Sequence, residues 1–243
     1  MKLVQLNVWG GRLQSQIANF LAEQQPDVLC LQEAISFNKD DAAVFITIEN
    51  IQKANQLQYA VIAPVFSFNL MNGEARFGNC ILSRFPVQKS EIVFTHLEHQ
   101  ENFDFNEHDS NMRNFIHAVI KDESRAFNIL THHGYHIPDH KNGDKETLRQ
   151  MKQIGQYIDQ LGGPVILAGD FNLSPYSRSL GQLNTRLTNL SIKHHLKTTR
   201  TSLTHKTEVC DYIFVNKEIK VKKFYAANEV VSDHKALVLD FDI

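Results

Sequence analysis

The chain has 243 residues, 42% of them hydrophobic and 21% charged, with a formal net charge of −2. This length suffices for one sizeable α/β domain, and the composition argues against disorder. The near-neutral charge gives no general attraction for nucleic acid, although a local groove can still be basic.

Targeting signals and membrane segments are not evident in the sequence. No basic segment precedes an apolar stretch, and no apolar run approaches the roughly 20 residues that span a bilayer. The three cysteines, Cys30, Cys80 and Cys210, are far apart and lie in apolar, strand-like runs. We therefore expect small core residues of a reduced, cytoplasmic protein without stable membrane insertion.

The first quarter of the chain predicts a strand, a helix and a second strand. Residues 2–8 alternate loosely between apolar and polar side chains, and four apolar residues then fall on one helical face: Leu13, Ile17, Phe20 and Leu21. Pro26 and Asp27 end this helix, and residues 28–32 predict a buried strand.

A strand-rich middle follows a second helix, which is predicted over residues 42–57 with Val44, Ile48 and Ile51 facing inward. Residues 96–111 are polar and interrupted, and they predict an irregular loop. Strands are predicted over residues 59–63, 77–83, 87–94, 114–120 and 126–130.

The last 100 residues predict a helix and four more strands. The helix over residues 145–161 has an apolar stripe and ends at Gly162 and Gly163. The strands are predicted over residues 164–168, 209–215, 219–226 and 236–242. No repeat or long linker divides the chain, so we expect one domain over residues 1–243, with two packed sheets covered by helices.

Polar residues recur at or beside the ends of these apolar strands. Burial of such groups is costly unless another side chain, a metal or a ligand satisfies them, and α/β folds commonly build sites at strand ends. The residues concerned are Asn7, Glu33, His132, Asp170, Asn172, Asp211, Asp233 and His234.

Seven segments, in order LNVW, LQE, GNCILSRFPV, THH, GDFNLSP, CDYIFV and SDH, resemble the endonuclease/exonuclease/phosphatase superfamily. The resemblance runs from about residue 3 to residue 240, and LNVWG is closer to the sphingomyelinase-like and uncharacterised bacterial branches. It implies a deoxyribonuclease I-like fold: a four-layer α/β sandwich of two mixed, mostly antiparallel sheets packed face to face with helices outside.

The chemistry of phosphate ester hydrolysis is largely positioning and neutralisation of charge. A hard cation such as Mg²⁺ prefers carboxylate oxygens and retained waters, and Mn²⁺ is a possible substitute. We expect Glu33 to be the metal ligand, with Asn7 beside it, and the resemblance gives Asp233 a role at the metal or the nucleophile.

The remaining site residues would act on the water and the phosphate. Asp170 is the candidate for positioning and activating the attacking water, and Asn172 for holding a phosphate oxygen or that water. His234 would stabilise developing charge, and the resemblance gives Asp211 the role of orienting it.

A second histidine would donate to the phosphate. The choice between His132 and His133 is open from the sequence. The family's usual Thr-His-Leu pattern favours His132.

Several further residues are candidates for contact with substrate. Trp9 is either a core or rim aromatic or a stacking surface, and Lys141 or Lys145 could lie near phosphate in a loop whose Asp144 caps the next helix. The basic segment 186–206 is either a solvated linker or a phosphate-binding rim. Other candidate substrate-binding residues are Arg76, Asn79 and Tyr135.

A zinc site at the histidines of residues 132–140 is disfavoured, because their spacings fit neither a regular helix nor a knuckle. We expect a monomeric, Mg²⁺-dependent phosphodiesterase that acts on a phosphate ester, foremost as a nuclease on DNA or RNA. The alternatives are a sphingomyelinase-like or small-molecule phosphoesterase, such as one acting on inositol phosphates, and an inactive binding module. All central residues of the pattern are present, which argues against the inactive module.

Overall fold

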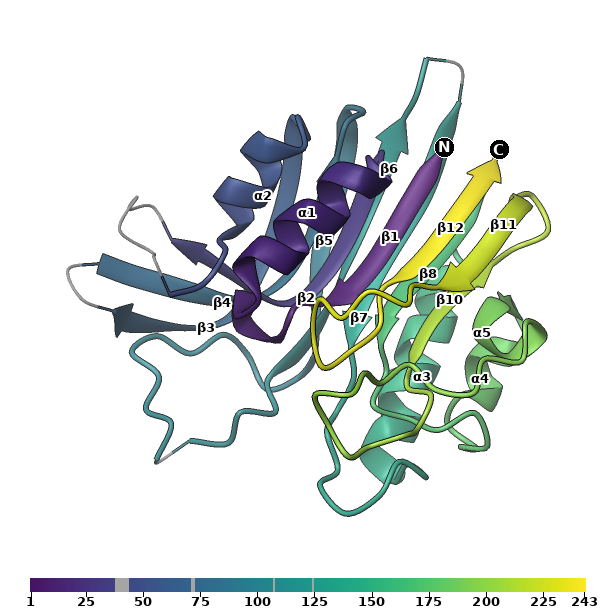
Figure 1. Ribbon diagram of the computed structural model, residues 1–243. Coiled ribbons are helices and arrows are strands. Elements are labelled where there is room, and N and C mark those ends of the chain that lie inside the picture. The colour runs from purple at the N-terminus through teal and green to yellow at the C-terminus, as the bar shows by residue number, and fades with distance from the viewer. Residues whose placement is uncertain (38–43, 71–72, 107, 124) are drawn as a thin grey trace.

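Two six-stranded sheets pack face to face in the computed structural model, which describes all residues except 38–43, 71–72, 107 and 124 (Figure 1). The first sheet has the order β11 (Lys220–Ala226), β12 (Leu237–Asp242), β1 (Lys2–Asn7), β2 (Val28–Phe37), β4 (Gly73–Ser83) and β3 (Tyr59–Leu70). The second sheet has the order β5 (Val87–His96), β6 (Arg113–Lys121), β7 (Ala126–His133), β8 (Val165–Asp170), β10 (Asp211–Val215) and β9 (Thr188–Asn189).

Each sheet contains one parallel pair of neighbours near its centre. These pairs are β1 with β2 and β7 with β8, and the other neighbours pair antiparallel. The prediction of two mixed, mostly antiparallel sheets is therefore confirmed. The parallel pairs matter for function, because parallel strands end at the same edge of a sheet.

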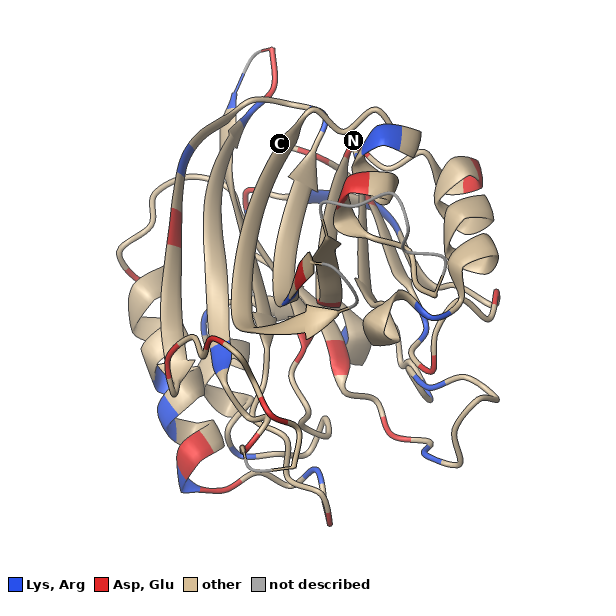
Figure 2. Ribbon diagram, turned by 90° about the vertical axis from the view of Figure 1, so that its left-hand side faces the viewer, with Lys and Arg blue, Asp and Glu red and all other residues tan. Residues whose placement is uncertain are grey.

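Helices cover both outer faces and complete four layers, and Figure 2 shows them on opposite sides of the sheets. The helices α1 (Gln14–Gln24) and α2 (Ile48–Ala54) pack on the first sheet, and α3 (Lys145–Ile158) and α4 (Gly181–Asn184) pack on the second. Two short helices, η1 (Trp9–Gly11) and α5 (Leu190–Lys193), follow β1 and β9. Among the described residues, no helix is long and apolar enough to cross a membrane.

The central core lies between the two sheets and is built from the inward residues of both. Leu3, Ile81, Ile129 and Ile166 are among its fully buried members. Cys30 also lies there, and all three cysteines are buried and free, as the sequence predicts.

The second helix is shorter than predicted. It begins at Ile48, because the Thr47 side chain accepts a hydrogen bond from the backbone N–H of Asn50 in a capping box. The prediction that Val44 faces inward is wrong, since this side chain precedes the helix and is 72% exposed. The predicted start at residues 42–43 lies outside the described residues.

The boundaries of other elements also differ from the prediction. The helix α3 begins after Asp144, whose side chain accepts from the N–H of Thr147 as predicted, but it ends at Ile158 rather than at residue 161. The strand β2 continues to Phe37, five residues beyond its predicted end. A shift in its register with β4 between Leu31 and Ala34 lets the pairing continue past the polar pair Gln32–Glu33.

Two glycines allow the backbones beside the central parallel pair of the second sheet to approach closely. A Cβ atom on Gly169 would lie 2.0 Å from the carbonyl oxygen of His132, and one on Gly134 would lie 2.1 Å from that of Phe171. No side chain fits at either position without displacing backbone. These close approaches set the positions of His133 and Asp170, which adjoin the two glycines.

We expect Gly169→Ala to lower the free energy of unfolding by about 1–3 kcal/mol, because a well-packed backbone must move to admit the methyl group. Urea denaturation measures this. The matched control is Gly181→Ala in α4, where nothing lies within 4 Å of the new Cβ atom and alanine favours the helix. Equal stabilities of the two variants would contradict the role of Gly169.

Candidate active site

The polar residues predicted from the sequence gather between the two sheets at one edge. Asn7 ends β1, Asp170 ends β8, and Asp211 opens β10, which runs antiparallel to β8. A cavity of about 260 Å³ opens there. Its lining residues are Trp9 and a mostly charged or polar set: Glu33, Ser110, Arg113, His133, His136, Asp170, Asn172, Arg200, Lys206, Asp233 and His234. Asp211 does not line the cavity.

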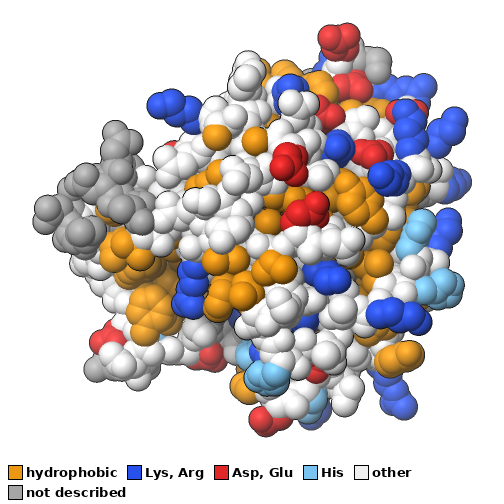
Figure 3. Space-filling model, in the orientation of Figure 1, with side chains coloured by type: hydrophobic (Ala, Val, Ile, Leu, Met, Phe, Trp, Pro, Cys, Tyr) orange, Lys and Arg blue, Asp and Glu red, His pale blue; other side chains and the backbone are white. Residues whose placement is uncertain are grey.

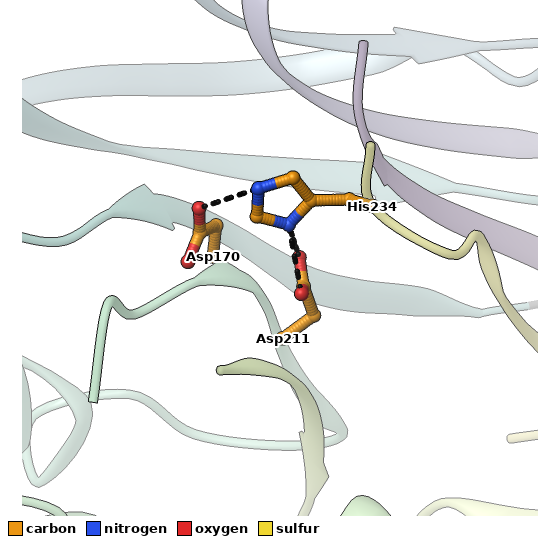
Figure 4. A group of neighbouring side chains, drawn as sticks. All are labelled: Asp170, Asp211 and His234. Carbon is orange, nitrogen blue, oxygen red and sulfur yellow. Dashed lines mark hydrogen bonds and ion pairs between the residues drawn. The ribbon is translucent and has the colours of Figure 1, made fainter. Parts of the chain in front are cut away.

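His234 lies between two aspartates (Figure 4). Its Nδ1 is 2.9 and 3.0 Å from the two carboxylate oxygens of Asp211, and its Nε2 is 3.5 Å from Oδ2 of Asp170. Asp211 is itself held by the hydroxyl of Thr199, which donates to its Oδ2 at 2.6 Å. The imidazole is therefore oriented by a buried carboxylate and directed at a second one.

The charges of this group support one another. Burial and the guanidinium of Arg200 oppose the charged form of His234, but Asp211 and Asp170 outweigh them and raise the pKa of the imidazole to about 9. Burial likewise opposes ionisation of Asp170, yet the positive charges of His234 and Arg200 hold the pKa of this carboxyl below its usual range. At neutral pH the pair is an imidazolium beside a carboxylate.

Asn7 links the aspartate to Glu33. Its Nδ2 donates to Oε1 of Glu33 at 3.0 Å and to Oδ2 of Asp170 at 3.2 Å, while the backbone N–H of Trp9 donates to its Oδ1 at 3.0 Å. The contact with Trp9 fixes the orientation of the amide. In this geometry Asn7 presents N–H groups to the carboxylates and aligns Glu33.

The backbone around the cluster adopts uncommon conformations. Glu33 sits in the register shift of β2 with a φ of 54°, Asn172 also has a φ of 54°, and Trp9 has a φ of 51°. Non-glycine residues with positive φ cost free energy and are concentrated at functional sites. The shift in β2 directs the Glu33 side chain into the cavity. In a regular strand, the alternation of side chains would have pointed Glu33 to the opposite face of the sheet from its neighbour Gln32.

Glu33 suits a hard cation. Burial raises the pKa of its carboxyl, with the hydrogen bond from Asn7 acting in the opposite sense, so a cation in the cavity would favour the ionised form. Asp233 lines the same cavity and offers a second carboxylate. Ligating atoms of Asp170, Asp211 and His234 lie within 4.8 Å of one another, but Asp211 and His234 are engaged with each other. Glu33 is therefore the better candidate ligand for a divalent cation.

His133 is the histidine that faces the cluster. Its Nε2 lies 3.8 Å from Oδ2 of Asp170 and 3.9 Å from Oε1 of Glu33. The sequence favoured His132, but successive side chains of β7 point to opposite faces, and His132 packs against Phe171 on the other side of the sheet. Burial lowers the pKa of His133 well below its ordinary value, so its imidazole is neutral.

Three cations border the cluster, and the sequence had suggested two of them, Lys141 and Arg200, as possible contacts with phosphate. Lys141, one of two lysines considered for phosphate, donates to Oδ1 of Asn172 at 2.7 Å. Arg200, in the basic segment, contacts both Asp233 and Nε2 of His234. Arg113 donates to the carbonyl of Gly134 at 2.7 Å, and its only sequence signal is a charge directly before an apolar strand.

Three predicted substrate-binding residues lie away from the cluster. Arg76 is exposed and pairs with Glu74, and the buried Asn79 donates to Oδ1 of Asn114 across the two sheets. Tyr135 packs against His96 and lines neither this cavity nor the adjoining one, which has a volume of about 560 Å³. Trp9, by contrast, lines both.

Carboxylates, histidines and cations gathered at one edge of two mixed sheets are groups that can position and neutralise a phosphate ester. The model of the Endonuclease/Exonuclease/phosphatase family matches residues 4–234, and the chain belongs to this family. Family membership supports phosphoesterase activity. A search of curated proteins finds no match.

Solved structures show the same fold along the whole chain. A family protein from Leptotrichia buccalis has a TM-score of 0.69 at 19% identity, with 100% of both chains covered. A mannosyl-6-phosphatase from Bacteroides thetaiotaomicron has a TM-score of 0.70 at 17% identity, also covering 100% of both chains. TDP2 from D. rerio, complexed with single strand DNA product, has a TM-score of 0.69 at 16% identity and covers 100% of this chain and 99% of its own.

The raised pKa of His234 predicts how the stability of the metal-free protein depends on pH. The stabilisation is full below about pH 6.5, the ordinary value, and is lost as the pH rises through about 9. The loss amounts to at most about 3 kcal/mol. Denaturation in chelator at pH 6.5 and pH 9.5 measures it, with His234→Gln as the control that cannot titrate there. The same loss in both proteins would contradict this assignment.

Proposed function

We propose that this protein is a metal-dependent phosphodiesterase whose catalytic centre is the cluster of Asp170, His234 and Glu33. The observation that carries the proposal is the pair formed by Asp170 and His234, a carboxylate and an imidazolium 3.5 Å apart that face one cavity with Glu33. One group accepts from a water molecule, while the other donates to a phosphate. The metal is Mg²⁺, with Mn²⁺ as its substitute.

The reaction replaces one P–O bond by another. The ionised Asp170 orients a water molecule and accepts a proton from it as the water oxygen bonds to phosphorus. Asn172, whose backbone N–H donates to Oδ1 of Asp170 at 2.9 Å, holds the carboxylate in place. The ester oxygen leaves with its bonding electron pair and takes a proton from solvent.

Charge that develops on the phosphate meets preorganised donors. His234 donates through Nε2 to a non-bridging oxygen, while Asp211 maintains the orientation and charge of the imidazole. His133, Arg113 and Arg200 line the same cavity and supply further N–H groups. A cation held by Glu33, with Asp233 contributing, would neutralise charge on the leaving oxygen when bound.

Nucleic acid, the substrate class that the sequence favours, remains a prediction. It is supported by the cationic groups at the cavity, namely Arg113, Arg200 and Lys206, and by likeness to a fold that has been crystallised with single strand DNA. A nucleic-acid substrate requires activity that falls steeply with salt, because contacts with phosphates release counterions. Cytoplasmic location and the monomeric state also remain predictions.

We expect His234→Ala and Asp170→Asn each to lower kcat on a chromogenic phosphodiester by at least about 100-fold, the lower end for a positioned acid–base group. The control is His140→Ala, an exposed histidine in the loop before α3. Circular dichroism and urea denaturation establish that the variants are folded. Near wild-type turnover by both variants would exclude this centre.

We expect Glu33→Gln to raise the Mg²⁺ concentration for half-maximal activity by at least about tenfold, because it removes the charge of the proposed ligand. Calorimetric titration of Mg²⁺ gives a readout that is independent of turnover. Glu218→Gln, at an exposed position after β10, is the matched control. An unchanged Mg²⁺ affinity would place the metal elsewhere.

A further inference from the structure

A second and larger cavity adjoins the catalytic one. Its volume is about 560 Å³, within the range of small-molecule sites. The two cavities share five lining residues: Trp9, Glu33, Ser110, Arg113 and His133. The two cavities are therefore neighbours, and a molecule with its phosphate at the catalytic cluster would reach this space past the five shared residues.

Beyond these shared residues, the described lining of the cavity is apolar except for Arg12. The strands β2, β3 and β4 supply a lining of phenylalanine and isoleucine that includes Ile35, Phe37, Phe66, Phe68 and Phe77. The rings of Phe66 and Phe77 stack with centroids 4.8 Å apart. Among the residues that the structure describes, the charged ones that line the cavity are Glu33, Arg12 and Arg113, and Glu33 and Arg113 lie at the shared, catalytic end.

Apolar side chains continue from the cavity to the surface. Val44 and Phe105 line it and are 72% and 64% exposed, the first after β2 and the second after β5. Figure 3 shows hydrophobic side chains gathered on the side of the molecule where β3 and β4 lie, next to Lys or Arg. Contiguous exposed apolar surface is typical of binding sites.

The polarity of the two cavities selects the ligand. The catalytic cavity offers cations and N–H groups to a phosphate. Most of the described lining of the larger cavity is hydrocarbon side chain. A nucleobase in the apolar end would leave its hydrogen-bonding edge unpaired, at a cost of about 1–3 kcal/mol per group. A hydrocarbon chain carries no such groups and gains free energy from the same burial.

We propose that the apolar cavity binds a hydrocarbon chain carried by the phosphodiester substrate, so that this enzyme acts on an amphiphile of the phospholipid type. The chain lies along Phe66, Phe68 and Phe77 and leaves past Phe105, while the phosphate lies against His133 and Arg113. This inference rests on the proposed function, since it assigns the substrate of the same catalytic centre.

The test is hydrolysis of p-nitrophenyl alkyl phosphates from methyl to dodecyl, each below the concentration at which it forms micelles. Full burial stabilises each methylene by about 0.8 kcal/mol, close to a fourfold gain. We expect kcat/KM to rise by at least about twofold per methylene until the cavity is filled. Phe105→Asp and Val44→Asp, at the exposed rim, should each reduce the advantage of dodecyl over methyl by at least about tenfold while leaving the methyl ester unchanged.

The matched control is Ile192→Asp, a partly exposed residue of α5 that lines neither cavity and should leave the whole series unchanged. Turnover that is independent of chain length would overturn the inference and leave the phosphodiesterase intact. A preference for an aryl ester or an oligonucleotide over every alkyl ester would overturn it equally.

If no diester is hydrolysed, a binding measurement with alkyl phosphates distinguishes failure of the hydrocarbon site from failure of the proposed phosphodiesterase function. Trp9 is the only tryptophan of the chain and lines both cavities, so its fluorescence reports occupancy without turnover. A shift on addition of dodecyl phosphate, absent with methyl phosphate and weakened in Phe105→Asp, would support the chain site although the proposed function had failed. Equal responses to the two phosphates would refute the chain site.

Discussion

The mutual neutralisation of Asp170, His234 and Asp211 is the interaction on which the rest of the site depends. All three side chains are buried between the sheets, where an unpaired charge would cost several kcal/mol. Each is tolerable only because the others are present and because Thr199 and Asn7 supply hydrogen bonds. The same arrangement that makes burial possible gives an ionised carboxylate beside an imidazolium, which is the state that the proposed hydrolysis uses.

The backbone geometry of the two sheets places the polar side chains of the cluster close together. The parallel pairs of the two sheets bring the ends of β1, β7 and β8 together, and Gly134 and Gly169 let the neighbouring backbones approach without a side chain between them. Glu33 reaches the cavity because β2 shifts register at that residue and adopts a positive φ. Irregularities at Glu33 and Asn172 thus serve the site directly.

The register shift in β2 has a second consequence, because it places catalytic and apolar surfaces side by side. Residues before the shift belong to the closed core, whereas Ile35 and Phe37 after it line the open apolar cavity. Glu33 lies at the junction and borders both cavities. In the proposed substrate complex, one strand therefore borders both the reaction centre and the hydrocarbon chain, and the phosphate lies between them.

The sequence by itself determined the fold class and most of the cluster, because periodicity, caps and polar residues at strand ends are local features that survive folding. Local features predicted the Asp144 cap and the buried Ile17, Phe20 and Leu21 of α1, although Leu13 of the same predicted face precedes the helix. They also predicted that Asn7, Asp170 and His234 gather at one site. Tertiary structure decided which face each side chain points to and which residues from distant parts of the sequence it contacts. One residue of offset along β7 brings His133 to the site instead of His132, and Arg113 and the apolar cavity arise only where separate strands meet. The sequence pattern does not show which face of a strand is buried or which strands are its neighbours. Those two properties determine the choice of His133, the position of Arg113 and the apolar cavity.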